Sequence, residues 1–88
     1  MQNYSQEIIV KNPHGLHVRP ASIFVQIASK FDSQVKLEKD GKVVDGKSII
    51  ALLSLGINRG MKVKLIVEGE DAQSAFSELK EFLEKEDD

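Results

Sequence analysis

Hydrophobic and polar positions alternate in three parts of the chain, and hydrophobic positions recur every three or four residues in two others. Alternation predicts strands over residues 7–11, 35–38 and 61–67, and the valine pair 43–44 predicts a further strand that pairs with 35–38 in a hairpin. The helical period predicts an apolar stripe on each of two helices, over residues 18–31 and 72–83, and the short apolar run 49–55 predicts a third helix between them. The predicted order of elements is therefore βαββαβα.

Short polar and glycine-containing segments separate these elements. Asp40-Gly41, between the alternating run 35–38 and the valine pair 43–44, is typical of a β-hairpin turn. Ser48 is placed to cap the second helix and Gly56 to end it. Asp71 lies near the start of the third helix, where a carboxylate is favoured. Strands and helices that are each apolar on one side bury each other best in two layers. The sequence thus predicts one α+β domain over residues 1–88, an antiparallel sheet with helices on one side.

Composition limits what this domain can do. The 88 residues are 41% hydrophobic and 30% charged, as in soluble globular proteins, and suffice for one core. The longest apolar run, 49–53, is far shorter than the roughly 20 residues of a membrane-spanning helix, and the first residues lack a secretion signal. Without cysteine there is no disulfide or thiolate metal site, and a net charge of −2 argues against nucleic-acid binding. We therefore expect a cytoplasmic protein.

The segment Gly15-Leu16-His17-Val18-Arg19-Pro20-Ala21 places a histidine and an arginine where the first helix begins. Free N–H groups at a helix start favour an anion. An imidazole titrates near about pH 6.5, so at neutral pH it has a ring nitrogen that can attack phosphorus. We expect His17 to accept a phosphoryl group and Arg19 to bind its charge. In a simpler interpretation His17 only caps the helix and Arg19 is a solvated surface residue. A metal site with His14 lacks a well-spaced third ligand.

Together with Lys47-Ser48-Ile49-Ile50 and Leu53-Ser54-Leu55-Gly56, this segment resembles HPr, the histidine-containing phosphocarrier family of the bacterial phosphoenolpyruvate:sugar phosphotransferase system. The resemblance covers essentially the whole chain. It implies an open-faced β-sandwich, a four-stranded antiparallel sheet with three helices on one face. It also implies that His17 takes phosphate on Nδ1 from phosphorylated enzyme I and passes it to the A domains of enzymes II for sugar uptake, assisted by Arg19. The expected protein is a monomeric carrier without turnover of its own, cofactor or metal.

The same resemblance implies a regulatory phosphorylation. In many bacteria the serine that matches Ser48 is a target of HPr kinase/phosphorylase, and the modified form acts on a catabolite-control transcriptional regulator. An apolar docking surface is expected beside it, formed by Phe24, Ile49, Ile50 and Leu53. A phosphate adds about −1.5 to −2 charges and should weaken docking there. Ser48 can also serve only as a helix cap. The chain departs from the family's usual residues at Val18 and at 50–52.

Three other functions compete with the carrier hypothesis. A purely regulatory protein would act through phosphorylated Ser48 alone, as histidine-lacking relatives do, and the presence of His17 disfavours it as the sole role. An RNA-binding module of similar βα pattern would need exposed aromatic residues and a basic sheet, which are not evident. Residues 41–48 fit the GxxxxGK[ST] phosphate-loop pattern, but they cross a predicted hairpin instead of following a buried parallel strand.

Overall fold

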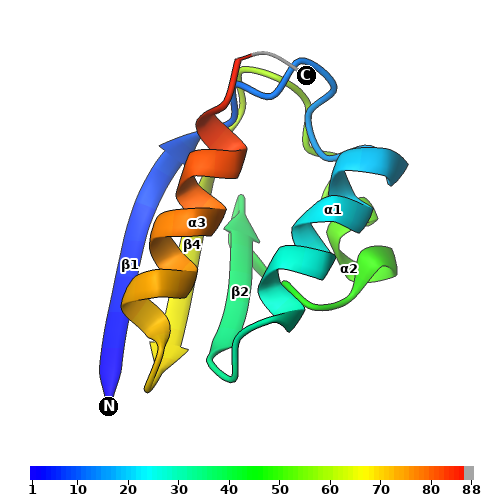
Figure 1. Cartoon of the computed structure of the whole chain (residues 1–88). Coiled ribbons are helices and arrows are strands. Elements are labelled where there is room, and N and C mark those ends of the chain that lie inside the picture. The colour runs from blue at the N-terminus through cyan, green and yellow to red at the C-terminus, as the bar shows by residue number, and fades with distance from the viewer. Residues whose placement is uncertain (87–88) are drawn as a thin grey trace.

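The computed structural model describes residues 1–86 and has the predicted order of elements. The strands are β1 Gln2–Ile9, β2 Gln34–Lys39, β3 Lys42–Asp45 and β4 Lys62–Gly69. The helices are α1 Val18–Ser29, α2 Ile49–Leu53 and α3 Ala72–Glu84. All strand pairs are antiparallel, in the order β1-β4-β2-β3. The helices form a layer on one face of the sheet (Figure 1), which confirms the predicted open-faced α+β sandwich.

The core lies between the two layers. The central strand β4 buries Val63, Leu65 and Val67 and turns its lysines outward. In β2, Leu37 pairs with Leu65 and Val35 with Val67, so apolar side chains are direct neighbours across the strands. The helices cover them with their apolar stripes, whose fully buried members are Ala21, Phe24, Ala28, Leu52, Ala72, Ala75, Leu79 and Leu83.

The first strand is longer than the alternation predicts, and it begins at Gln2 instead of residue 7. It is an edge strand that pairs with β4 along its whole length, from Gln2 opposite Gly69 to Ile9 opposite Lys62. Main-chain pairing needs no apolar side chains, and Ile8 is the one fully buried residue of β1. The polar residues 2–7 therefore gave no hydrophobic pattern. Helices α1 and α2 each end two residues earlier than predicted, within the usual uncertainty of helix ends.

The hairpin between β2 and β3 forms as predicted. Asp40 and Gly41 both have positive φ, 51° and 84°, as the turn of a two-residue hairpin requires. Lys39 pairs with Lys42 across the turn. Because residues 42–45 of the GxxxxGK[ST] match at 41–48 form an antiparallel strand, the match is not the loop between a buried parallel strand and a helix that binds phosphate.

Asp71 precedes α3 as predicted, but its side chain makes no capping hydrogen bond. The carboxylate instead accepts hydrogen bonds from the backbone N–H groups of Asp32 at 2.9 Å and Ser33 at 3.0 Å, and from the Ser33 hydroxyl. The Ser33 hydroxyl, and after it the Asp32 N–H, hold the pKa of this carboxyl below its ordinary value of 3.8. Asp71 thus joins the segment before β2 to the segment before α3.

Replacing Asp71 with asparagine is expected to lower the melting temperature by several degrees at pH 7, because the amide has one acceptor oxygen and no charge. A lowered pKa stabilises the fold above the carboxyl's unfolded value, and this contribution is lost as the pH falls through the folded value. The difference between wild type and Asp71→Asn should therefore shrink below pH 4. Asp32→Asn is the matched control, because only the backbone of Asp32 contacts Asp71. A melting-temperature difference independent of pH would contradict this account.

Candidate functional site

The segment between β1 and α1 is tied down at several points. The N–H groups of Lys11 and Asn12 both donate to the carbonyl of Leu83 near the end of α3, at 2.9 and 3.3 Å. The side-chain oxygen of buried Asn12 accepts from the His14 N–H at 3.2 Å, and the backbone carbonyl of Asn12 accepts from the Gly15 N–H at 2.9 Å. The segment leading to His17 is therefore held in one conformation by the fold.

Gly15 allows this segment to pack against the backbone that precedes β4. Its φ is +58°, a conformation that residues with a side chain rarely adopt. A Cβ atom at this position would lie 2.5 Å from the carbonyl oxygen of Ile57 and 2.8 Å from the Cα of Asn58. The neighbouring N–H of buried Leu16 donates to the same Ile57 carbonyl at 3.0 Å. The glycine in the sequence motif is thus required by a backbone-to-backbone contact.

His17 is the N-cap residue of α1, with extended backbone angles and an exposed side chain. Its side chain makes no capping hydrogen bond, so the simpler interpretation of His17 as a helix cap is wrong for the imidazole. Instead, Nε2 lies 2.8 Å from Oδ1 of Asn58, 41 residues further along the chain. Sequence spacing gave no signal for this partner.

The start of α1 offers fewer backbone donors than an ordinary helix. The N–H of Ala21 already donates to the His17 carbonyl at 2.8 Å, and Pro20 has no N–H. The N–H groups of Val18 and Arg19 are the ones that helix geometry leaves without an intrahelical acceptor. An anion on His17 would therefore meet two backbone donors and the positive end of the helix dipole.

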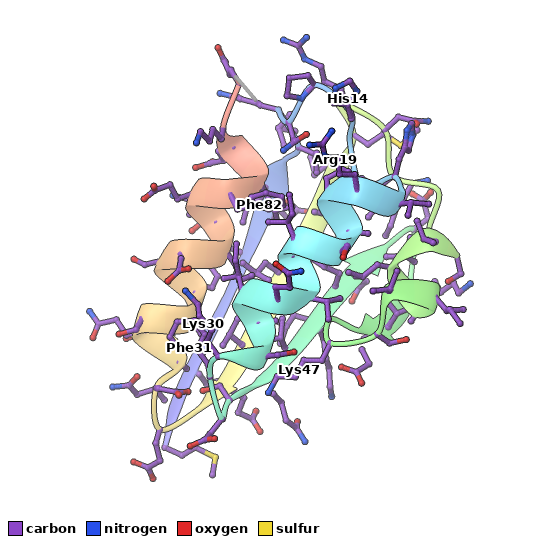
Figure 2. All side chains as sticks on the ribbon, turned by 45° about the vertical axis from the view of Figure 1, so that its right-hand side comes forward. His14, Arg19, Lys30, Phe31, Lys47 and Phe82 are labelled. Carbon is purple, nitrogen blue, oxygen red and sulfur yellow. The ribbon has the colours of Figure 1, made fainter. Side chains whose placement is uncertain are left out.

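Arg19 is exposed in the first turn of α1 and lines a neighbouring hollow. This hollow has a volume of about 400 Å³ and is lined by Asn12, His14, Arg19, Pro20, Ile23, Phe82 and Lys85. Figure 2 shows His14 and Arg19 at this end of the molecule. His17 is not among the residues that line the hollow, although Arg19 lies only two residues from His17 in the first turn of the helix.

Ser48 caps α2, as predicted. Its hydroxyl oxygen accepts from the Ala51 N–H at 3.2 Å, and its carbonyl accepts from the Leu52 N–H at 3.0 Å. The preceding Lys47 reaches away from the cap, and its Nζ donates to the Phe31 carbonyl at 2.8 Å. Figure 2 labels both Lys47 and Phe31. The serine is half-buried at the start of a helix, where added negative charge is compatible with the fold.

The four residues expected to form a docking surface differ in exposure. Ile50 is 82% exposed and Ile49 37%, while Leu53 is half-buried. The prediction for Phe24 is wrong, because its side chain is fully buried beneath α1 and packs against Phe82, with ring centroids 6.5 Å apart. Val18, which is 66% exposed and follows His17, is a further exposed apolar side chain that the prediction did not name.

The part of the chain that the structure describes, residues 1–86, brings together no group of three side chains suited to hold a metal ion. His14 and His17 therefore have no third ligand within these residues. No helix in this range has the length and apolar character needed to cross a membrane.

Comparison with known proteins identifies the family. The family model described as the PTS HPr component phosphorylation site matches residues 4–85. The chain belongs to the HPr family. It is 48% identical over 81 residues to the HPr-like protein Crh of Halalkalibacterium halodurans, covering 92% of this chain and 96% of that one. It is 47% identical over 79 residues to the phosphocarrier protein HPr of Borreliella burgdorferi, covering 90% and 92%.

Solved HPr structures confirm the fold. The phosphocarrier protein HPr of Bacillus anthracis superposes with a TM-score of 0.90 at 36% identity, covering 94% of this chain and 99% of that one. Crh of Bacillus subtilis has a TM-score of 0.77 at 47% identity, covering 92% and 93%, and is described as a domain-swapped dimer. The expectation that this chain is monomeric therefore has no support from that relative.

Proposed function

We propose that this HPr-family chain carries a phosphoryl group on His17, receiving it from phosphorylated enzyme I and passing it to the A domains of enzymes II for sugar uptake. The observation that carries the proposal is the exposed His17 ring at the start of α1. A neutral ring nitrogen there is accessible to a partner protein, and the developing phosphate charge lies beside the Val18 and Arg19 N–H groups.

The proposed transfer is a reversible exchange between two proteins. Nδ1 of His17 forms a bond to phosphorus while the bond from phosphorus to the donor's atom breaks, and the donor keeps that electron pair. A helix start stabilises an exposed anion by about 0.3–1 kcal/mol. Such weak stabilisation suits a carrier, because a tightly held phosphoryl group would not be released to the next protein. The protein is thus modified and restored by its partners and catalyses no turnover alone.

Mass spectrometry can test the proposal directly. The purified chain is incubated with phosphoenolpyruvate and enzyme I, and the intact mass and fragments are recorded before and after acid treatment. We expect one added phosphate that is acid-labile and located on His17. An absence of phosphate, or an acid-stable phosphate on a serine alone, would contradict the assignment to His17.

A second role at Ser48 is supported by the relatives. Two of the curated relatives are HPr-like proteins named Crh, and a solved structure of one is described as a catabolite repression HPr. We propose that Ser48 is phosphorylated by an HPr kinase/phosphorylase and that the product acts on a catabolite-control regulator. The cap position supports this, because the phosphate would lie beside the exposed apolar residues Ile49 and Ile50. Because the chain has His17, we propose that it serves both as a carrier and in regulation, and not in regulation alone.

Replacing Ser48 with aspartate is expected to slow phosphoryl acceptance by about tenfold. Binding an apolar partner surface there would bury the added charge without a partner, which costs free energy. Aspartate caps a helix as well as serine does, so α2 should remain folded. Rapid mixing with phosphorylated enzyme I, followed by quenching, measures the rate of acceptance. Ser74→Asp, an equal charge on the exposed side of α3, is the control and should leave the rate unchanged. Equal rates in Ser48→Asp and wild type would show that a charge at position 48 does not affect docking of the phosphoryl donor.

A further inference from the structure

The contact between His17 and Asn58 has a specific chemical consequence. Asn58 presents its amide oxygen to Nε2 at 2.8 Å, and an amide oxygen can only accept a hydrogen bond. Nε2 must therefore carry the ring proton. In a neutral imidazole only one nitrogen is protonated, so Nδ1 is left with its lone pair free.

We propose that Asn58 is a positioning residue for phosphoryl transfer, which holds the proton on Nε2 of His17 and aims Nδ1 at the donor. This inference rests on the proposed function. During transfer the Nδ1 lone pair forms the bond to phosphorus, the donor's bond to phosphorus breaks, and its electron pair returns to the donor. The Nε2 proton stays in place and continues to donate to Asn58. With the proton on Nδ1, the same attack would first require its removal.

The backbone around Asn58 is fixed well enough to orient a side chain. Its carbonyl accepts from the Met61 N–H at 3.2 Å, which closes a turn that contains Gly60 at φ +90°. The N–H of Gly60 donates to the Val10 carbonyl at 2.7 Å, and the Val10 N–H donates to the Met61 carbonyl at 2.9 Å. The turn is thus attached to the end of β1.

The histidine side of the contact is held by the same backbone. The Leu16 N–H donates to the Ile57 carbonyl at 3.0 Å, one residue from each partner of the His17–Asn58 hydrogen bond. Gly15 allows this approach because it has no Cβ. Two backbone segments that are hydrogen-bonded to each other therefore bring Asn58 to the exposed His17 ring, and the hydrogen bond between the side chains selects one ring orientation.

Nitrogen-15 NMR of the unmodified protein tests the first half of the proposal without any partner. At a pH where the ring is neutral, we expect Nε2 to be protonated with a slowly exchanging proton and Nδ1 to be unprotonated. Asn58→Ala should speed the exchange of the Nε2 proton with solvent and widen the range of orientations that the ring samples. A protonated Nδ1 in the wild type, or unchanged exchange in Asn58→Ala, would overturn the proposal.

Transfer kinetics test the second half. Asn58→Ala is expected to accept phosphate about three- to tenfold more slowly, the equivalent of one lost hydrogen bond, and to remain folded with a melting temperature lowered by only several degrees. Asn58→Asp restores an acceptor that is now charged and favours the protonated ring. Its pH profile of acceptance should shift upward by about one pH unit and reach the wild-type rate at high pH. Arg59→Gln changes the charge of the same turn by one unit without touching the hydrogen bond, and its profile should not move.

The outcomes separate this inference from the proposed function. If the wild type accepts phosphate and Asn58→Ala matches its rate, the role of Asn58 is refuted while His17 remains the acceptor. If the wild type accepts none, the proposed function fails and the transfer role of Asn58 fails with it. A pH profile that is unmoved in Asn58→Asp would likewise overturn the positioning role, since a carboxylate in contact with Nε2 must favour the protonated ring.

Discussion

Replacing His17 with alanine is expected to abolish phosphoryl acceptance, lowering the rate by about 1,000-fold or more, because the attacking nitrogen is removed. The fold should be little affected. The ring is exposed, it does not cap α1, and its side-chain hydrogen bond to Asn58 is worth about 1 kcal/mol. Acceptance is measured by transfer of labelled phosphate from phosphoenolpyruvate through enzyme I, and folding by thermal denaturation.

The exposed His14 provides a matched control for this experiment. It lies three residues earlier in the same segment but outside the start of α1. His14→Ala should retain acceptance within about threefold, which shows that the effect belongs to one imidazole and not to any histidine of the segment. Transfer that survives in His17→Ala, or that is lost equally in both variants, would refute the assignment of His17.

Much of the fold could be predicted from the period of the hydrophobic positions. Val63 and Leu65 alternate with Lys62 and Lys64 in the sequence, and together with Val67 they are buried on one face of β4 in the structure. The stripe from Ala72 to Leu83 is buried on α3 in the same way. These patterns depend on which side of an element faces the core, and local sequence carries that information. The turn at Asp40-Gly41 and the cap at Ser48 are equally local.

The features that could not be predicted depend on contacts between distant parts of the chain. Asn58 reaches His17 across 41 residues, and Asp71 binds the backbone of residues 32–33 instead of its own helix. Neither contact has a periodic signal. Phe24 shows a different error, because its place on the apolar stripe of α1 already indicated the core and not a docking surface.

The largest structural effect is expected from Gly15→Ala. Alanine would be forced into a left-handed conformation, and its Cβ would meet the backbone of Ile57 and Asn58, which cannot move aside as a flexible side chain would. We expect a loss of about 2–4 kcal/mol in the free energy of unfolding, from backbone strain and overpacking together. Acceptance by His17 should also fall, because the displaced segment separates His17 from Asn58. Urea denaturation and labelled-phosphate transfer measure the two effects.

Gly56 offers a control with the same backbone conformation and no steric conflict. Its φ is +60°, against +58° for Gly15, but a Cβ added there has no atom within 4 Å. Gly56→Ala should therefore cost only the left-handed strain, about 1–2 kcal/mol, and should leave phosphoryl acceptance unchanged. The difference between the two variants isolates the contact that joins the His17 segment to the turn of Asn58. If both alanines cost the same, that contact is not what requires glycine at position 15.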